Sequence, residues 1–252
     1  MISKGDIKRL WIFDFDGTVS NLVPDRRKAR LNIDCARMID KLIGDPENRV
    51  AILSSRTLPD LCQRVGGELP DVYLGGNNGL IWQLPDGRTR EKGGKEELLK
   101  IRRNLFMPKT EILKKYPGLE IEDKKWSIAI HLRRASDSVK SDVRMILEEI
   151  SPFRDFRKLL GPEVIEILFF PEFDKAFGIR NLCEFLEYEP EPEGLICAGD
   201  DENDLSAMQW VLFMKGLVFT VGDHPLIRGS YLSPTPSSLP EVIFSSFSEE
   251  SA

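Results

Sequence analysis

The sequence predicts an α/β protein whose parallel-sheet core is interrupted by an inserted α+β domain. Short apolar runs without alternation recur near residues 9–15, 49–55, 71–79, 194–200 and 216–222. Segments with helical periodicity separate most of these runs, which is typical of strands covered on both faces of a parallel sheet. Between about residues 86 and 171 the pattern changes to alternating strands and charged helices, which indicates a separate unit.

Local sequence patterns predict the strands and helices of the first part of the chain in turn. The strand at 9–15 leads into a helix at 29–45, and the strand at 49–55 leads into a helix at 58–67 that glycines close. The strand at 71–79 ends in a turn. A hairpin is expected over 80–91, because Pro85, Asp86 and Gly87 form a turn signal between two apolar or alternating runs.

The insert and the last part follow in the same way. We expect a helix over about 95–116, a half-exposed strand at 124–135, a helix at 136–150 and a strand at 163–170. A helix at 175–186, a strand at 194–200, a helix at 201–211 and a strand at 216–222 follow, and the tail from Ser233 reads as a loop or a frayed helix. The prediction is a Rossmann-like core of residues 1–85 and 172–252 with an inserted domain of residues 86–171.

Composition excludes several classes of protein. The 252 residues are 41% hydrophobic and 30% charged, which favours a sizeable core and argues against disorder. A net charge of −6 argues against a nucleic-acid partner. No apolar run approaches the roughly 18 residues of a membrane span, and no secretory leader is expected. Four cysteines without C-x-x-C spacing are expected to be reduced thiols in a cytoplasmic protein, and two histidines exclude a histidine-rich metal site.

The residues that follow the predicted strands can carry chemistry. In open α/β sheets, ligands bind beyond the carboxyl ends of the strands. The side chains expected at that edge are carboxylates, hydroxyls and cations: Asp14, Asp16, Ser54, Ser55, Arg56, Lys175, Asp200, Asp201 and Asp204.

Several carboxylates at one edge repel each other unless a cation neutralises them, and hard oxygen ligands suit Mg²⁺. We expect Asp14 and Asp200 to hold Mg²⁺, with Asp16, Asp201 and Asp204 as further ligands. Asp14 is the candidate nucleophile that forms an aspartyl-phosphate, and Asp16 is the candidate general acid and base. Ser54 and Lys175 are expected to hold the phosphoryl oxygens, with Ser55 and Arg56 beside the substrate.

These motifs have other interpretations. A calcium loop starting at Asp14 would require glycine at position 19 and glutamate at position 25, where the chain has Val19 and Asp25. Taken alone, "DFDGT" could end a strand in a turn, and "GDDEND" could cap a helix. A serine after a strand is usually a cap, and a lysine in a first helical turn is usually solvated. The motifs favour a phosphoryl-transfer site because they occur together and in order after apolar strands.

The motifs "DFDGT", "LSSR", "DK" and "GDDEND" resemble the four motifs of the haloacid dehalogenase superfamily of phosphatases, and their order and spacing cover nearly the whole chain. The insert lies between the second and third motifs, where the sugar-phosphatase branch carries an α+β cap. The resemblance implies a Mg²⁺-dependent phosphatase with a Rossmann-like core. It implies a small-molecule sugar phosphate as the substrate.

A second pattern lies within the insert. "EDKKWSIAIHLR" places Glu122, Lys124, Ser127, His131 and Arg133 in the order E-x-K-x-x-S-x-x-x-H-x-R, which resembles the trehalose-6-phosphate phosphatase family. By that resemblance the candidate sugar contacts are Glu122, Lys124, His131, Arg133 and Glu166. The residues alone leave open a solvated strand face for the first two and a hydrogen-bonded structural role for His131. Hydrolysis of trehalose 6-phosphate is the implied activity, and a sugar-phosphate synthase is a candidate partner.

The sequence departs from that family at several points. Ser55 and Asn78 stand where the family usually has glycine and histidine, "EILFFP" replaces Glu-Val-Arg-Pro after Glu166, and "KAFG" separates Lys175 from its glycine. These departures concern the sugar rather than the hydrolysis. The alternatives are therefore a phosphatase of sucrose, glucosylglycerol or mannosylglycerate phosphate, a phosphosugar mutase, or an inactive regulatory partner of a synthase.

Overall fold

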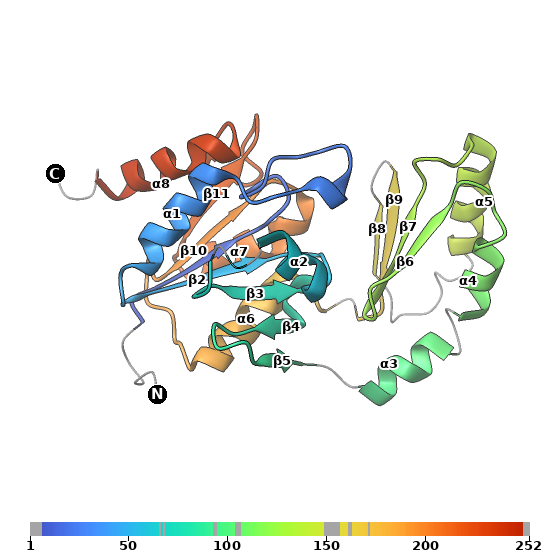
Figure 1. Cartoon of the computed structure of the whole chain (residues 1–252), viewed down its shortest axis with the longest axis horizontal. Helices are drawn as coiled ribbons and strands as arrows, with labels where there is room; N and C mark the ends of the chain where they lie inside the picture. Colours follow the sequence, from blue (N-terminus) through green and yellow to red (C-terminus); the bar gives the residue numbers. More distant parts are fainter. Residues whose placement is uncertain are drawn as a thin grey trace. The chain divides into compact units, whose positions relative to one another are not determined.

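The computed structural model (Figure 1) describes residues 7–65, 67, 69–92, 95–103, 107–148, 157–160, 163–170 and 172–248. Contacts between Cα atoms divide the chain into two units. The first consists of Met1–Lys92 and Asp174–Ala252, and the second consists of Gly93–Phe173. Each unit has its own sheet, which is described separately below.

Eight described strands form the sheet of the first unit, in the order β12-β11-β10-β1-β2-β3-β4-β5. The six from β12 to β3 run parallel, and β4 and β5 add an antiparallel hairpin at one edge. Their bounds are β1 Arg9–Phe13, β2 Asn48–Leu53, β3 Tyr73–Gly76, β4 Ile81–Gln83, β5 Thr89–Glu91, β10 Leu195–Gly199, β11 Leu217–Val221 and β12 Tyr231–Ser233.

Helices cover both faces of this sheet. Side chains of α1 (Ile33–Ile43), α2 (Leu58–Val65) and α8 (Leu239–Ser248) join one buried apolar cluster. Side chains of α6 (Lys175–Leu186) and α7 (Leu205–Phe213) join the other. The strand β1 contributes Trp11 and Phe13 to the first cluster and Leu10 and Ile12 to the second, because successive side chains of a strand point to opposite faces. Burial on both faces explains why its sequence is apolar throughout.

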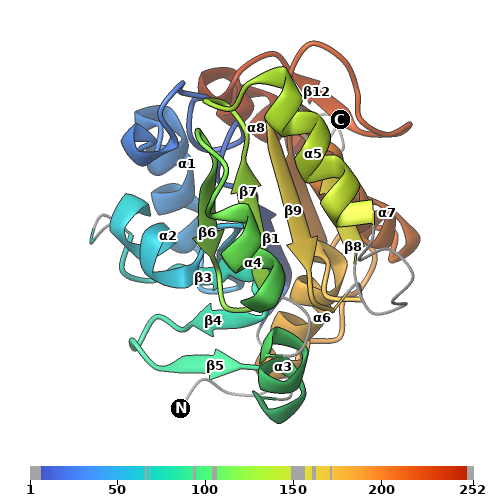
Figure 2. The ribbon, with the colours of Figure 1, turned by 90° about the vertical axis from the view of Figure 1, so that its right-hand side faces the viewer.

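Four described strands form the antiparallel sheet of the second unit, in the order β6-β7-β9-β8. They are β6 (Glu120–Asp123), β7 (Ser127–His131), β8 (Arg157–Leu160) and β9 (Val164–Leu168). The helices of this unit are α3 (Lys95–Ile101), α4 (Met107–Leu113) and α5 (Asp137–Glu148), and Figures 1 and 2 show α4 and α5 along one face of the sheet. Alternate residues of β7 and β9 on one face, including Ile128, Ile130, Ile165 and Ile167, are buried and apolar.

The α/β class and the mostly parallel core sheet are confirmed. The tail, predicted as a loop or a frayed helix, ends in a packed helix: after a 3-10 turn at η6 (Pro236–Ser238), helix α8 packs on the core with Leu239 and Ile243 fully buried. Serine and glutamate dominate the exposed positions of this helix, and they masked its apolar stripe. The short strands β6, β8 and β12 were not predicted. The helix expected over 95–116 is described as two, α3 and α4, and residues 104–106 between them lie outside the described part.

The hairpin expected over 80–91 is present as β4 and β5, and it extends the sheet of the first unit. This pairing explains why the contacts assign residues 86–92 to that unit. Residue 171, where the insert is predicted to end, lies outside the described residues, as do residues 149–150 of the helix predicted over 136–150. Among the described residues, no helix has both the length and the apolar character needed to cross a bilayer.

Candidate active site

Three neighbouring strands deliver the central acidic and hydroxyl groups. The sheet order β10-β1-β2 places the carboxyl ends of these parallel strands side by side. Asp14 follows β1, Ser54 follows β2 and Asp200 follows β10. Lys175 is the first residue of α6, whose N-cap Asp174 accepts a hydrogen bond from the Phe177 amide at 2.9 Å. The fold therefore brings together groups that lie far apart in the sequence.

A buried lysine lies at the centre of this site. The ammonium of Lys175 donates to Asp14 Oδ1 at 2.5 Å and to Asp204 Oδ1 at 2.6 Å. Both acidic side chains and the lysine are buried. Burial disfavours the charged form of Lys175, but Asp14, Asp204 and Asp201 outweigh it and raise its pKa well above the usual value. The lysine therefore stays charged and offsets part of the negative charge of the site.

The carboxylates remain in excess over this lysine. Burial raises the pKa of Asp14 well above its usual value, and Asp204 and Asp200 add to this while Lys175 opposes it. Burial, with Asp204 and Asp201 nearby, raises the pKa of Asp200 to about 7. Elevated pKa values of this origin indicate negative charge that lacks compensation, and a bound cation would supply it.

Asp204 orders the loop after β10. Its Oδ2 accepts the amides of Asp200 and Asp201 at 3.1 and 3.3 Å, while its Oδ1 accepts from Lys175. Asp201 in turn caps the 3-10 turn η5 (Glu202–Asp204) by accepting from the Asn203 amide at 2.9 Å. Both oxygens of Asp204 thus accept hydrogen bonds from the protein. This favours a role for Asp204 in holding Lys175 and Asp200 in place.

The turn after β1 holds Asp200 from the other side. Thr18 donates to Asp200 Oδ1 at 3.2 Å. Gly17 has φ +88°, and a Cβ there would lie 2.0 Å from Asp200 Oδ2. Glycine is therefore needed here both for the backbone conformation and for the close approach of the carboxylate. The sequence interpretation assigned no role to Thr18, although its place in "DFDGT" was a signal that could have been followed.

The acidic groups fit a hard divalent cation. Among the described residues, Asp14, Asp200 and Asp204 bring ligand oxygens within 4.8 Å of one another. A set made only of carboxylate oxygens matches the preference of Mg²⁺, and the pKa values of Asp14 and Asp200 are raised. Asp16 and Asp201 are not in this set: Asp16 pairs with Arg56, and Asp201 caps η5.

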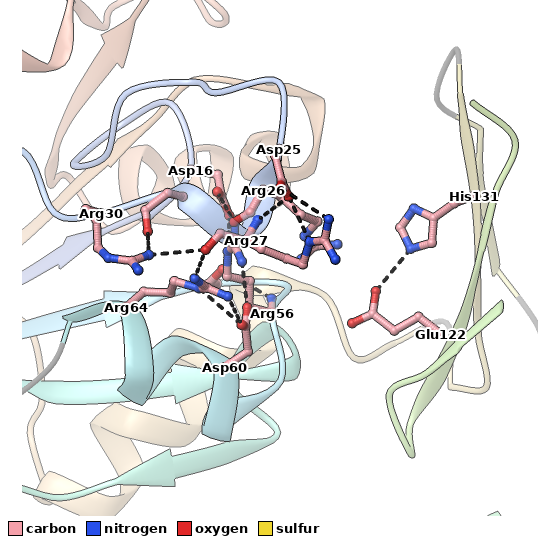
Figure 3. Close-up of polar contacts among 12 residues, drawn as sticks. Asp16, Asp25, Arg26, Arg27, Arg30, Arg56, Asp60, Arg64, Glu122 and His131 are labelled. Atoms are coloured by element: carbon pink, nitrogen blue, oxygen red, sulfur yellow. Dashed lines mark hydrogen bonds and ion pairs between the residues drawn. The ribbon is translucent and has the colours of Figure 1, made fainter. Parts of the chain in front are cut away.

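Asp16 is held by a buried arginine (Figure 3). Arg56 Nε and Nη2 donate to the two oxygens of Asp16, each at 2.6 Å. The arginine side chain is 1% exposed, whereas that of Asp16 is 34% exposed. The ring of Phe15 lies under the guanidinium, with its centroid 5.5 Å from Cζ. Arg56 therefore lies against the candidate acid and base, and its predicted place beside the substrate stays a prediction.

Ser54 and its neighbours shape the end of β2. Ser54 is buried, and its Oγ accepts the amide of Arg56 at 3.2 Å. Its backbone carbonyl accepts the amide of Asn78 at 2.9 Å. Ser55 is half-buried at the same loop. Ser54 therefore lies at the carboxyl end of the parallel strands, and Arg56 links it to Asp16 by contacting both residues.

The loop with Asn78 positions helix α6. Asn78 is buried with φ 57°, a left-handed conformation that asparagine tolerates. A Cβ on Gly178 would lie 2.2 Å from the Asn78 carbonyl oxygen, so only glycine allows this backbone contact. Asn181 adds a hydrogen bond to the Gly79 carbonyl at 3.0 Å. The spacing "KAFG" therefore places the required glycine one turn after Lys175, where α6 meets this loop.

The candidate sugar contacts lie in the second unit and form their own polar network. Cross-strand pairing aligns Glu122, Ala129 and Glu166 in one row of the sheet. Lys124 is buried, and its ammonium lies 3.1 and 3.0 Å from the two oxygens of Glu166, which also accepts from Ser127 at 2.6 Å. The network joins residues at β6, β7 and β9 or at their ends.

The remaining motif residues form two pairs. His131 Nε2 and Glu122 Oε2 are 3.1 Å apart (Figure 3), so the histidine is hydrogen-bonded within the sheet. Arg133 Nε donates to Glu163 Oε2 at 2.8 Å in an exposed pair. Sequence reasoning missed Glu163, and the same is true of Asp60 and Arg64 in the first unit. Nothing in the local pattern distinguishes these residues from ordinary surface charges.

Comparisons with known proteins first show what the fold is similar to. The fold of this chain resembles that of a phosphatase of the haloacid dehalogenase superfamily. A phosphatase of this superfamily from Bacteroides thetaiotaomicron superposes with a TM-score of 0.62 at 13% identity, covering 97% of each chain.

The chain belongs to the trehalose-phosphatase family, whose sequence profile matches residues 12–225. It is 28% identical over 204 residues to a trehalose-phosphate phosphatase from Mycobacterium leprae, covering 79% of this chain and 47% of the relative. The chain thus spans about half the length of that curated relative. A trehalose-6-phosphate phosphatase from Aspergillus fumigatus has a TM-score of 0.64 at 26% identity, with 97% of this chain and 93% of that chain covered.

Proposed function

We propose that this protein is a Mg²⁺-dependent phosphatase that hydrolyses trehalose 6-phosphate to trehalose and phosphate through an aspartyl-phosphate. The observation that carries the proposal is the contact of Lys175 with Asp14 and Asp204 beside Asp200, in a chain of the trehalose-phosphatase family. The polar network of the second unit, with Lys124, Ser127 and Glu166, supports a substrate rich in hydroxyl groups.

In the first step Asp14 attacks phosphorus while the bond from phosphorus to the sugar oxygen breaks. Lys175 orients Asp14 through Oδ1 and favours the anionic substrate. Asp16 gives a proton to the leaving sugar oxygen. A carboxylate oxygen accepts more than one hydrogen bond, so the contacts with Arg56 leave Asp16 capacity for this transfer.

In the second step a water attacks phosphorus, the bond from phosphorus to Asp14 breaks, and Asp16 takes the proton of the water. Asp14 and Asp200 are the proposed Mg²⁺ ligands. When bound, the ion would neutralise negative charge shared by the carboxylates and the phosphate. Ser54 is the proposed hydroxyl contact of the phosphoryl group.

The proposal also assigns the second unit to the sugar. Glu122, Lys124, His131, Arg133 and Glu166 are the proposed contacts, because charge-assisted hydrogen bonds to hydroxyl groups are strong and directional. A reducing compartment such as the cytoplasm is the proposed location, and the four free cysteines support it. A sugar-phosphate synthase is the proposed source of the substrate.

The test is a phosphate-release screen with the purified chain and Mg²⁺. The substrates are trehalose 6-phosphate, glucose 6-phosphate, the phosphates of sucrose, glucosylglycerol and mannosylglycerate, and p-nitrophenyl phosphate as an activated aryl ester. We expect the highest kcat/KM with trehalose 6-phosphate. A higher value for another sugar would overturn the substrate assignment and leave the mechanism. Transfer between sugar positions without phosphate release would indicate a mutase, and inactivity with every ester would indicate a regulatory protein.

A further inference from the structure

A chain of charged residues continues from Arg56 away from the candidate nucleophile. Arg56 Nη1 donates to Asp60 Oδ2 at 2.5 Å, and Asp60 lies one turn along on helix α2. Asp60 Oδ1 accepts from Arg64 Nη2 at 2.7 Å and from Nε at 3.1 Å. Burial opposes ionisation of Asp60, but hydrogen bonds from the two arginines lower its pKa below the usual value. Asp60 on helix α2, which is itself held by Arg64, therefore fixes the position of the Arg56 side chain.

The same arginines hold the loop that follows Asp16. Arg56 Nη2 donates to the Arg26 carbonyl at 2.9 Å, and Arg64 Nη1 donates to the Arg27 carbonyl (Figure 3). These carbonyls belong to the 3-10 turn η1 (Arg26–Lys28), which the Asp25 side chain caps. One network therefore ties both the Asp16 side chain and the chain segment after it to helix α2.

We propose that Arg56 and Asp60 are positioning residues that set the orientation of the Asp16 carboxylate for proton transfer. The proposal rests on the acid and base role of Asp16 in the proposed function. Asp16 is one-third exposed, so without a fixed partner its side chain would sample several rotamers. A planar guanidinium that donates to both oxygens restricts this motion, and a lysine at the same place cannot.

The geometry argues against substrate contact by Arg56. Each of its three nitrogens donates to a protein acceptor: Nε to Asp16, Nη1 to Asp60, and Nη2 to Asp16 and the Arg26 carbonyl. A phosphate that recruited this guanidinium would take the arginine from Asp16 and leave Asp60 with Arg64 alone. Removing a buried partner from a charged group is strongly destabilising. We therefore assign Arg56 to holding Asp16 rather than to binding the substrate.

The first experiment compares two substrates in the Arg56→Lys variant. The kcat/KM reports on steps up to formation of the phosphoenzyme. An activated aryl ester needs no proton on its leaving group there, whereas a sugar phosphate does. We expect kcat/KM for the preferred sugar phosphate to fall about tenfold to a hundredfold, since small misplacements of a catalytic group have effects of this size. The value for p-nitrophenyl phosphate should change much less.

Arg88→Lys is the matched control. Arg88 Nε and Nη2 both contact Asp86 Oδ2, each at 2.6 Å, in the exposed hairpin of the same unit, so the exchange is chemically similar but far along the sheet. This control variant should leave kcat/KM unchanged for both substrates. Asp60→Asn provides a second variant if Arg56→Lys folds poorly, and it should change the ratio of the two kcat/KM values in the same direction.

A double-mutant cycle separates positioning from other roles. If Arg56 acts through Asp16, Arg56→Lys should have little further effect on the substrate ratio in an Asp16→Asn background. Additive losses, or equal losses with both substrates, would overturn the positioning role. If Asp16→Asn alone leaves the substrate ratio unchanged, the acid and base role in the proposed function fails instead. The two failures are thus distinguishable by the single variant.

Discussion

The two units of this protein differ in the charge balance of their polar sites. In the first unit, Lys175 lies among Asp14, Asp200, Asp201 and Asp204, so the described carboxylates at this site outnumber the lysine. In the second unit the buried Lys124 is matched by Glu166, and the half-buried His131 shares a hydrogen bond with Glu122.

This difference separates two kinds of polar site. Burial, with the neighbouring carboxylates, raises the pKa values of Asp14 and Asp200. The excess of negative charge at this site favours the binding of a cation. Matched pairs have no such excess, so they can fix the orientation of donors and acceptors without attracting an ion. The first arrangement is suited to chemistry at phosphate and the second to recognition of hydroxyl groups.

Asp14→Asn removes the candidate nucleophile from the site with excess charge. The amide is nearly isosteric but cannot form the phosphoenzyme, so we expect phosphate release to fall by at least about a thousandfold. The circular dichroism spectrum should be unchanged. Turnover within tenfold of the parent would contradict the assignment of the nucleophile.

Lys175→Met removes the lysine at the centre of the same site. Asp14 and Asp204 would then face each other without it, and breaking a buried pair in this way costs about 3–5 kcal/mol of the free energy of unfolding. Urea denaturation of the metal-free protein measures this cost. The control is Lys8→Met, which removes an exposed partner of Glu47 and should leave the midpoint in place.

Lys124→Ala tests the matched charges of the second unit. Removing a charge-assisted hydrogen bond to the sugar should lower kcat/KM for trehalose 6-phosphate about tenfold to a hundredfold and narrow its advantage over glucose 6-phosphate. Hydrolysis of p-nitrophenyl phosphate should be spared. Lys114→Ala, at an exposed pair with Glu111 in the same unit, is the control. An equal loss with all substrates would argue against a sugar contact.

The pH dependence of Mg²⁺ stabilisation tests the excess charge directly. The raised pKa of Asp200, about 7, means that the folded metal-free protein keeps a proton that the unfolded chain has lost. This group therefore makes the metal-free protein less stable as pH rises from about 4 toward 7. Protons compete with Mg²⁺ below pH 7, so the rise in Tm on adding Mg²⁺ should be larger near pH 8 than near pH 6. Equal shifts at both pH values would exclude Asp200 as a ligand.

Arg133→Gln gives the smallest expected effect. Its pair with Glu163 is exposed on both sides, and such pairs contribute about 0–1 kcal/mol. The free energy of unfolding should therefore change by less than about 1 kcal/mol. A clear loss of kcat/KM with unchanged stability would identify Arg133 as a sugar contact.

Much of the first unit could be predicted from local patterns. Apolar runs that end in Asp14, Ser54 and Asp200 identified the buried strands and the edge that carries the candidate site. Buried parallel strands must be apolar on both faces, so their ends are visible wherever polar residues begin. The strands of the second unit were harder to predict from the sequence, because the short strands β6 and β8 carry mixed charged and apolar residues.

The sequence by itself determined the α/β class, the order of the motifs and the residues available for phosphate chemistry. Only the tertiary structure decided which carboxylate meets which cation: Asp14 meets Lys175 across 161 residues, and Asp16 meets Arg56 across 40 residues. Periodicity and turn signals act over a few residues, whereas ion pairs depend on distances set by strand order and helix packing. For the same reason Asp204 joins Lys175, 29 residues away, through a contact that no local pattern encodes, whereas Asp60 lies only four residues from Arg56.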